Sequence, residues 1–479
     1  MRLWHSASAT SAQFDDPNLV SCAGLVPVLR LAQDCGLAEL VGEQLAVAGP
    51  LGANTPFKIG CVVAGMIAGA DSIDDLDLLR QGGLTGLFDG VRAPSTLGSF
   101  LRAFSWGNVR QLEAVNRRLL AELAERTRIL PDAAALTWLD IDSCQRRVYG
   151  HAKQGAGFGH AKVGGYSVRL RGLHPLIAAV STPTSAPLVA GTRLRGGSAA
   201  SARGAASFVA ESITTARGAG ATGLLVARMD SAFYNAATIA ACRRGGARFS
   251  VTARMDPKIR RTIGQIPDHA WTGIRYPQAI WDEDEQRWIS DAEVAEVTYT
   301  AFASRPKNAV TARLIVRRVR RLAPPGQTEL GPAWRYHAVF TDSPFGMLVA
   351  EADHRHHAII EQLNAELIDG PLAHLPSGSF AANAAWLTCA GIAHNLLHAA
   401  ATLASRYHGT ARSGTLRRQL IAVPARIAHR GRDQIILHLP EHWPWPDAWD
   451  GLFQATHRAD HRAPPVSYTH LTLPTNSRV

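Results

Sequence analysis

Two short apolar runs that each end in an aspartate constrain the fold of this chain more than any other feature of its sequence. Residues 135–142 read Ala-Leu-Thr-Trp-Leu-Asp-Ile-Asp, and residues 223–230 read Gly-Leu-Leu-Val-Ala-Arg-Met-Asp. Their length and nearly continuous apolar character predict buried strands. The segments between and after them are predicted to be strands at 166–181, 187–194 and 247–253 and helices at 201–216 and 235–244.

The order of these elements is three strands, a helix, a strand, a helix and a strand, which is the order of a ribonuclease-H-like fold. In that fold the ends of the first and fourth strands lie side by side. Asp142 and Asp230 are therefore predicted to be neighbours. The predicted fold class is α/β, with a ribonuclease-H-like catalytic core over residues 131–390.

Three further regions surround this core. Residues 1–130 carry apolar side chains at helical spacing, for example over 108–126, and predict a helical N-terminal domain that is either a scaffold or a DNA-binding unit. A β-rich insertion at about 255–345 separates the last core strand from a late helical segment, 353–368. Residues 391–464 are predicted to form a basic, helical C-terminal region.

Two remaining stretches have unusual compositions. The last segment, 465–479, is rich in Ser, Thr, Leu and Pro and is expected to be a foreign or disordered tail. The glycine-rich stretch 150–165 lacks the Gly-Lys-Ser/Thr of a phosphate-binding loop, so we expect a flexible turn there.

The charge balance of the chain predicts an anionic partner. Among 479 residues, 50 are Lys or Arg and 39 are Asp or Glu, which gives a formal net charge of +11. Two stretches, 305–321 and 406–432, each carry seven basic residues and no acid. They are either solvated faces or phosphate-binding surfaces, and the strongly basic chain favours the second interpretation. The arginines predicted to contact DNA are Arg317, Arg318, Arg320, Arg321, Arg355, Arg417 and Arg418.

Cysteine spacing and hydropathy argue against two other classes of protein. The six cysteines are scattered, without a Cys-x-x-Cys pair, so neither a disulfide framework nor a zinc framework is expected. The most apolar stretch, about 380–403, is interrupted by Asn383, His394, Asn395 and His398. It predicts a buried helix and not a membrane span.

The strand-final acids predict a metal site. Two carboxylates brought together from separate strands repel each other, so such a site normally holds a cation. Carboxylate oxygens suit Mg²⁺ or Mn²⁺, and two such ions about 3.5–4 Å apart activate an attacking oxygen and stabilise a leaving one. The third acid is expected from the late helix, where Ile360 and Leu363 give Glu361 an apolar face to pack on the sheet.

Several alternatives to this set of acids stay open at the level of sequence. Glu351, Asp353 and Glu366 compete with Glu361 on position alone, and Asp140 competes with Asp142 for the first position. A single aspartate at a strand end is also common as a turn or cap residue.

Extended blocks of sequence add a family resemblance to this pattern. The blocks lie at residues 15–21, 139–143, 196–206, 228–235, 360–361, 374–378 and 438–440. Through them the chain resembles the DDE transposases of bacterial insertion sequences, and within these the insertion-sequence-1380 family, from about residue 14 to 460. The blocks carry the resemblance, because an isolated Asp-x-Asp is not specific.

The resemblance implies a catalytic triad of Asp142, Asp230 and Glu361 in a ribonuclease-H-like core with a β-rich insertion before the glutamate. Asp142 is preferred to Asp140 because the family's first aspartate is typically followed by small hydroxyl residues, which Ser143 matches. Cys144 stands where a threonine is usual.

The resemblance also implies an activity and its partners. These are divalent-metal-dependent cleavage at the ends of an insertion sequence, followed by strand transfer of the 3′-hydroxyl into target DNA. The implied partner is double-stranded DNA, both terminal inverted repeats and target, bound by a homodimer in the bacterial cytoplasm at the nucleoid, with no membrane role. Two alternatives remain: a nuclease or resolvase of the same fold that cuts without joining, and an inactive DNA-binding relic.

Overall fold

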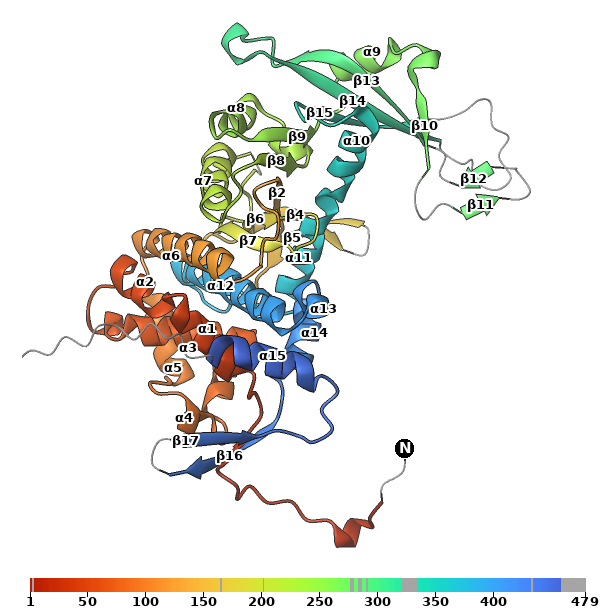
Figure 1. The fold of residues 1–479 in the computed structure, drawn as a ribbon. Coiled ribbons are helices and arrows are strands. Elements are labelled where there is room, and N and C mark those ends of the chain that lie inside the picture. The colour runs from red at the N-terminus through yellow and green to blue at the C-terminus, as the bar shows by residue number, and fades with distance from the viewer. Residues whose placement is uncertain are drawn as a thin grey trace, which may run out of the picture.

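The protein extends along one long axis, with N-terminal helices at one end, a sheet in the middle and the β-rich insertion at the other end (Figure 1). This computed structural model describes residues 1–457, apart from residues 2–3, 164–165, 201, 276–279, 283–286, 290–291, 321–333 and 432–433. Arg321 and the tail at 465–479 therefore lie outside the described residues.

The N-terminal region is helical, as its periodicity predicts. Its α-helices are α1 (Leu25–Asp34), α2 (Leu37–Gln44), α3 (Thr55–Ala68), α4 (Leu84–Leu87), α5 (Pro94–Arg102) and α6 (Trp106–Arg126). The longest of them, α6, begins at Ser105, whose side chain and that of Asn108 each accept a hydrogen bond from the other's backbone N–H. This reciprocal cap satisfies amide groups that the first turn leaves without partners.

A mixed sheet forms the centre of the molecule. Its core elements are β2 (Leu136–Ser143), β6 (Leu176–Ser181), β7 (Leu188–Arg193), α7 (Ala205–Gly218), β8 (Leu224–Met229), α8 (Ala236–Arg244) and β9 (Arg248–Thr252). The strand order β9-β8-β2-β6-β7 places β8 beside β2. The strands β2, β8 and β9 run parallel, whereas β6 is antiparallel to both β2 and β7. The predicted adjacency of the first and fourth core strands is therefore confirmed.

The glycine-rich stretch departs from its prediction as a turn. Residues Gly157–Val163 form β4, which pairs with β5 (Tyr166–Leu173) in a small sheet completed by β3 (Arg146–Arg147). A Cβ atom on Gly159 would lie 2.5 Å from the carbonyl oxygen of Gly197. Glycine here permits close backbone packing rather than a flexible loop.

The predicted β-rich insertion lengthens the central sheet. Its elements are α9 (Pro257–Gly264), β10 (Thr272–Ile274), β11 (Ile280–Asp282), β12 (Arg287–Ile289), β13 (Ala292–Ala301), β14 (Val310–Arg320) and β15 (Trp334–Thr341). Strand β15 pairs antiparallel with β9, so the sheet continues as β9-β15-β14-β13-β10. The chain returns to the core through α10 (Met347–Arg355), a 3₁₀ turn (His356–Ala358) and α11 (Ile359–Ile368).

Helix α12 (Phe380–Ala404) connects the core to the N-terminal helices. It is buried along nearly all of its length and contacts β7, α3, α5 and α6. The predicted domain boundary at residues 390–391 therefore falls inside one continuous helix. Among the described helices, none combines the length and apolar character needed to cross a membrane.

The C-terminal region is only partly helical, which corrects the prediction for 391–464. After the short helices α13 (Arg406–Gly409) and α14 (Ser413–Leu416), strands β16 (Ala425–Arg430) and β17 (Gln434–His438) pair antiparallel and lie beside β1 (Leu19–Val20). A final helix, α15 (Pro446–His457), packs on α12. Along β16, buried Ala425 and Ile427 alternate with exposed Arg426, which is the period of a strand.

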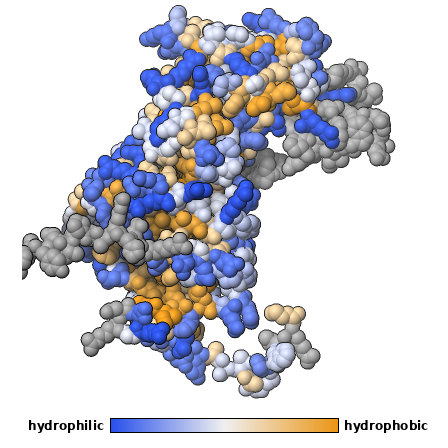
Figure 2. Space-filling view, viewed as in Figure 1, coloured by the Kyte–Doolittle hydropathy of each residue, from blue (hydrophilic) through white to orange (hydrophobic). Residues whose placement is uncertain are grey.

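The visible surface is mainly hydrophilic. Figure 2 shows hydrophobic side chains gathered near the N-terminal helices and over the strands of the insertion.

Candidate active site

The three predicted acids meet where β2 and β8 end. Asp142 is the penultimate residue of β2, and Asp230 follows β8 directly. The preceding residues, Ile141 and Met229, are register partners on these two parallel strands. Glu361 lies in the first turn of α11, close enough for its charge to act on Asp142.

The charges of the three carboxylates act on one another. Burial raises the pKa of Asp142 to about 6, and the neighbouring charges of Asp230 and Glu361 add to this increase, against the opposing effects of the Ser143 amide and of His357. Arg195 also interacts with this cluster: burial lowers the pKa of its guanidinium group to about 10, and the charge of Asp142 opposes that decrease. Such a cluster of acids is costly without a bound cation.

Local hydrogen bonds orient the two aspartates. Oδ1 of Asp142 accepts from the backbone amide of Ser143 at 2.7 Å, and its Oδ2 accepts from Nδ2 of Asn364 at 3.4 Å. Oδ1 of Asp230 accepts from the amide of Ala232 at 2.9 Å, which caps a 3₁₀ turn. Asp230 therefore does serve as a cap residue, and one carboxylate oxygen still remains for another partner.

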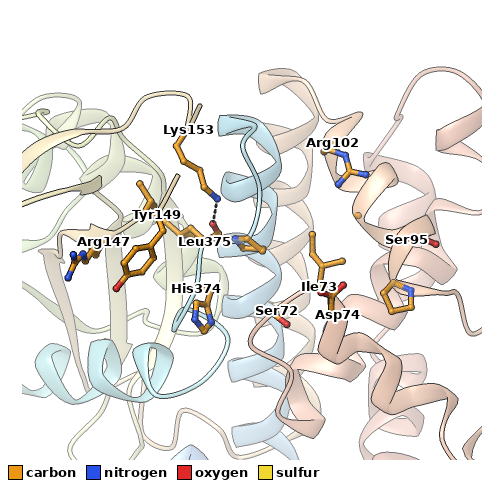
Figure 3. Close-up of a pocket in the computed structure, with 14 residues that line it drawn as sticks. Ser72, Ile73, Asp74, Ser95, Arg102, Arg147, Tyr149, Lys153, His374 and Leu375 are labelled. Atoms are coloured by element: carbon orange, nitrogen blue, oxygen red, sulfur yellow. Dashed lines mark hydrogen bonds between the residues drawn. The ribbon is translucent and has the colours of Figure 1, made fainter. Parts of the chain in front are cut away.

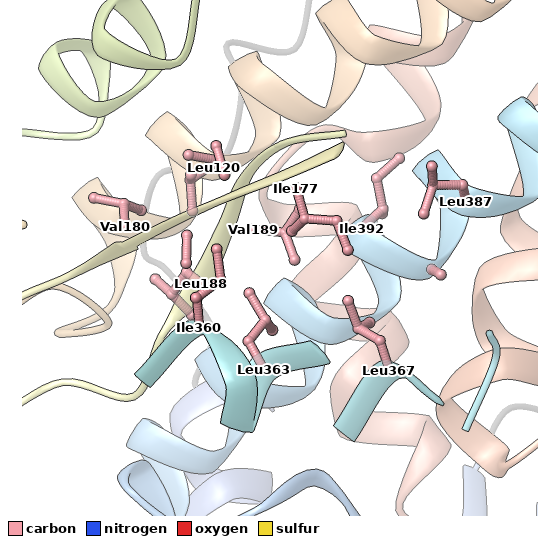
Figure 4. Close-up of a cluster of buried hydrophobic side chains, with 14 of the residues drawn as sticks. Leu120, Ile177, Val180, Leu188, Val189, Ile360, Leu363, Leu367, Leu387 and Ile392 are labelled. Atoms are coloured by element: carbon pink, nitrogen blue, oxygen red, sulfur yellow. The ribbon is translucent and has the colours of Figure 1, made fainter. Parts of the chain in front are cut away.

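Apolar packing holds the helix that carries Glu361. Ile360, Leu363 and Leu367 are buried on one face of α11. Figure 4 shows this face turned toward side chains from β6, β7 and α12, among them Ile177, Val189, Leu387 and Ile392. The exposed Glu361 stands on another face of the helix, as the sequence predicts.

The rival acids are engaged elsewhere. Asp140 is fully buried and accepts two hydrogen bonds from Arg228, from Nε at 2.8 Å and from Nη2 at 2.7 Å. Asp353 also accepts from Arg228, and Glu351 pairs with Arg317 and Arg355. Glu366 accepts from the amide and hydroxyl of Ser413.

The predicted DNA-binding arginines of the insertion and of α10 mostly face acids of the same chain. Arg317 lies 3.2 Å from Glu351, and Nε of Arg355 donates to the same carboxylate at 2.9 Å. Arg318 pairs with Glu293 and lies over the rings of Trp271 and Trp334. These acids come from β13 and α10, outside the acid-free stretch 305–321.

The remaining arginines of this prediction differ in exposure. Arg320 is half-buried at the end of β14, Arg417 is half-buried near Glu366, and Arg418 is exposed. Burial lowers the pKa of Arg417. Of these three, the position of Arg418 fits a solvent-facing phosphate contact best.

A cavity of about 510 Å³ lies between the N-terminal helices and the core (Figure 3). Arg102 lines it from α5, while Arg147 and Tyr149 line it from the segment that follows β2. Lys153 donates to the carbonyl oxygens of Leu375 and Ser377 and so fixes the segment around Leu375, which also lines the cavity. None of the three acids lines this cavity.

The structure also brings together a second polar group, Glu366, His394 and His398, which was not predicted and whose possible ligand atoms all lie within 4.8 Å of one another. The hydroxyl of Ser413 lies among them, 2.7 Å from Glu366, 3.2 Å from His398 and 3.4 Å from His394. The group therefore forms a hydrogen-bonded link between α11, α12 and α14.

Sequence reasoning also missed the internal hydrogen bonds of Arg228, His354 and His357. His357 donates or accepts through Nδ1 at 2.8 Å from Asp140, and His354 lies between the hydroxyls of Ser250 and Thr252. An arginine inside an apolar strand, opposite an aspartate of another apolar strand, was the available signal.

The fold and the acids together define a class: an α/β protein whose mixed sheet brings two strand-borne aspartates and one helix-borne glutamate to the same end. The chain matches the family described as transposase DDE domain group 1 over residues 5–460 and belongs to that family. It is accordingly a transposase, an enzyme that acts on DNA. No curated protein matches it significantly.

Proposed function

We propose that this transposase uses divalent metal ions to cut DNA at the ends of an insertion sequence and to join the freed ends to target DNA. Asp142, Asp230 and Glu361 are the proposed catalytic residues. The single observation that carries this proposal is the meeting of three carboxylates at one end of the sheet, where burial and the charges of Asp230 and Glu361 raise the pKa of Asp142.

We further propose that the core is ribonuclease-H-like and that the protein is a member of the insertion-sequence-1380 family. The order β9-β8-β2-β6-β7, with β6 antiparallel to its neighbours and β8 and β9 parallel to β2, supports the first assignment. The resemblance of the sequence blocks supports the second.

The three carboxylates suit Mg²⁺ or Mn²⁺, because these hard ions prefer oxygen ligands. When bound, such ions activate the attacking oxygen and stabilise the leaving oxygen of a phosphodiester. The residues of the chain contribute orientation. The amides of Ser143 and Ala232 fix the two aspartates, and the apolar face of α11 fixes the glutamate.

The rim of the cavity between the N-terminal helices and the core is a proposed DNA contact, in addition to the predicted arginines. Arg102 and Arg147 are exposed, and neither forms an ion pair with any described residue. The guanidinium group of Arg147 lies 4.9 Å from the ring centre of Tyr149, which is 65% exposed. A free cation beside an exposed aromatic ring suits a phosphate and a base.

The activity is tested with the DNA that flanks this reading frame. A labelled duplex carrying the flanking inverted repeat, a target plasmid and Mg²⁺ or Mn²⁺ should yield both a nick at the repeat and a joined product. Asp142→Asn, Asp230→Asn and Glu361→Gln should abolish both products, whereas Asp450→Asn, which changes an exposed carboxylate on α15, should leave them intact. Nicks without joined product would favour a nuclease or resolvase. Unchanged activity in Asp230→Asn would rule out the metal mechanism.

The DNA surface is tested by comparing two double variants. Arg102→Gln/Arg147→Gln should flatten the dependence of log K on log salt by about 1.8, because each phosphate contact contributes about 0.9. Arg317→Gln/Arg318→Gln should change this slope less, because these side chains already face acids. The reverse ranking would restore the insertion as the main phosphate contact. A homodimer on DNA and a location at the bacterial nucleoid remain part of the proposal.

A further inference from the structure

The polar group beneath the three acids links every element that carries them. Asp140 and Arg228 are register partners on β2 and β8, two residues before Asp142 and Asp230. Side chains two residues apart on a strand point to the same face. Asp140 and Arg228 therefore lie directly behind the acids, on the side of the sheet that α10 and α11 cover.

Arg228 makes four hydrogen bonds to two residues from a position that is 1% exposed. Its Nε and Nη2 donate to the two oxygens of Asp140, and its Nη1 donates to the backbone carbonyl of Asp353 at 2.8 Å and to the carboxylate of Asp353 at 3.2 Å. The ring of Trp138 lies 4.8 Å beneath the guanidinium group. One side chain thus ties β2 and β8 to the end of α10.

A second contact follows one turn further along the chain. Nδ1 of His357, in the 3₁₀ turn between α10 and α11, lies 2.8 Å from Oδ1 of Asp140. The two attachments, at Asp353 and His357, lie in the segment that leads into α11 and its residue Glu361.

Two kinds of contact therefore hold α11, and they do different things. The buried face of Ile360, Leu363 and Leu367 provides apolar contact, which has no direction. Apolar packing alone tolerates a slip of the helix along the sheet, and one turn of slip moves a side chain by about 5.4 Å. A bidentate arginine–carboxylate pair has a fixed geometry and does not tolerate such a slip.

We infer that Arg228 is a positioning residue, which sets the register of α11 on the sheet and so brings Glu361 to Asp142 and Asp230. This inference rests on the proposed metal-dependent function. Replacing both members of a buried ion pair with well-packed groups of similar volume often leaves stability little changed, whereas removing one member is destabilising. Variants that keep the charge of Arg228, or that neutralise both members of the pair, should therefore affect the acids more than folding.

The experiment measures Mn²⁺ binding to the full chain without DNA, through the loss of the free Mn²⁺ signal in electron paramagnetic resonance. Arg228→Lys keeps the positive charge, but a lysine cannot form both the bidentate pair with Asp140 and the hydrogen bonds to Asp353. We expect its Mn²⁺ dissociation constant to rise at least tenfold. Amide hydrogen exchange should also become faster in the first turn of α11. Metal-dependent cleavage by this variant should require more Mn²⁺ while keeping a measurable maximal rate.

The matched control is Arg217→Lys. Arg217 donates to the carbonyl oxygens of Ala221, Gly223 and Gly246 and joins loops that precede β8 and β9, at the other end of the sheet. It should bind Mn²⁺ as the wild type does. If Arg228→Lys fails to fold, Asp353→Asn and the double variant Asp140→Asn/Arg228→Gln take its place, with the same expected loss of Mn²⁺ affinity.

The outcomes separate the two proposals. If Asp142→Asn binds Mn²⁺ as tightly as the wild type, the metal site itself is wrong. If Mn²⁺ binding depends on Asp142 but the folded variants at Arg228, Asp140 and Asp353 match the wild type, the positioning role is overturned and the metal site stands.

Discussion

Removing the charge of Asp142 should stabilise the metal-free protein while abolishing its response to metal. The pKa of Asp142 is raised from 3.8 to about 6 by burial and by the charges of Asp230 and Glu361. The folded carboxyl therefore binds its proton more tightly than the unfolded one. Ionisation of Asp142 therefore opposes folding. The destabilisation is complete above about pH 6 and absent below about pH 3.8.

The size of this effect follows from the shift. At pH 7.5, a difference of about 2.2 pKa units lowers the free energy of unfolding by about 3 kcal/mol. At pH 5, where the carboxyl is mostly protonated in the folded state, the decrease is about 1.6 kcal/mol. Solvent reaches Asp142 in part, so these are upper values. Asp142→Asn should therefore raise the free energy of unfolding by about 1–3 kcal/mol at pH 7.5 and by less at pH 5.

Urea denaturation with and without Mn²⁺ measures both effects. The wild type should gain stability on addition of Mn²⁺, whereas Asp142→Asn should start higher and gain little. Asp450→Asn, at an exposed site, should behave as the wild type does. A destabilised Asp142→Asn, or one that Mn²⁺ stabilises as strongly as the wild type, would refute the electrostatic reasoning.

Three further predictions concern the framework of the site. Leu363→Ala, at a fully buried position on α11, should lower the free energy of unfolding by about 3 kcal/mol in urea denaturation, whereas Leu348→Ala at an exposed position should change it little. Burial lowers the pKa of His354 to about 3, so between about pH 3 and pH 6.5 the unfolded chain binds a proton that the folded chain does not. The free energy of unfolding should therefore fall by about 2 kcal/mol on going from neutral pH to pH 5. His354→Gln should flatten this pH dependence in denaturation experiments, whereas His374→Gln, at an exposed position, should not. Ser105→Ala removes the reciprocal cap of α6 and should lower stability by about 1 kcal/mol, whereas Ser105→Asp should retain most of it; equal stability of the two variants would contradict the capping role.

Much of the site could be predicted because it depends on local pattern and on one rule of topology. The apolar runs that end at Asp142 and Asp230 identified two strands, and the carboxyl ends of adjacent parallel strands meet at one place. Spacing of Ile360 and Leu363 identified the buried face of α11 and left Glu361 exposed.

Charge pairing could not be predicted in the same way. The stretch 305–321 has no acid in its own sequence, yet Arg317 and Arg318 pair with Glu351 and Glu293. The second basic stretch was expected to be helical, but its residues Ala425–Arg430 form a strand that lies beside Leu19–Val20, far away in the chain. The number of charges in a stretch of sequence therefore does not show which acids from other strands or helices will pair with its arginines.

The sequence by itself determined the strands and helices of the core and which acids stand at strand ends, because periodicity and burial depend on residues a few positions apart. Only the tertiary structure decided which aspartate is available. Asp140 and Asp142 differ by two positions and point to the same face, but the register of β8 places Arg228 opposite Asp140 alone. The buried carboxylate of Asp140 is neutralised by its arginine partner. The carboxylate of Asp142 instead faces the charges of Asp230 and Glu361, an arrangement that favours a bound cation.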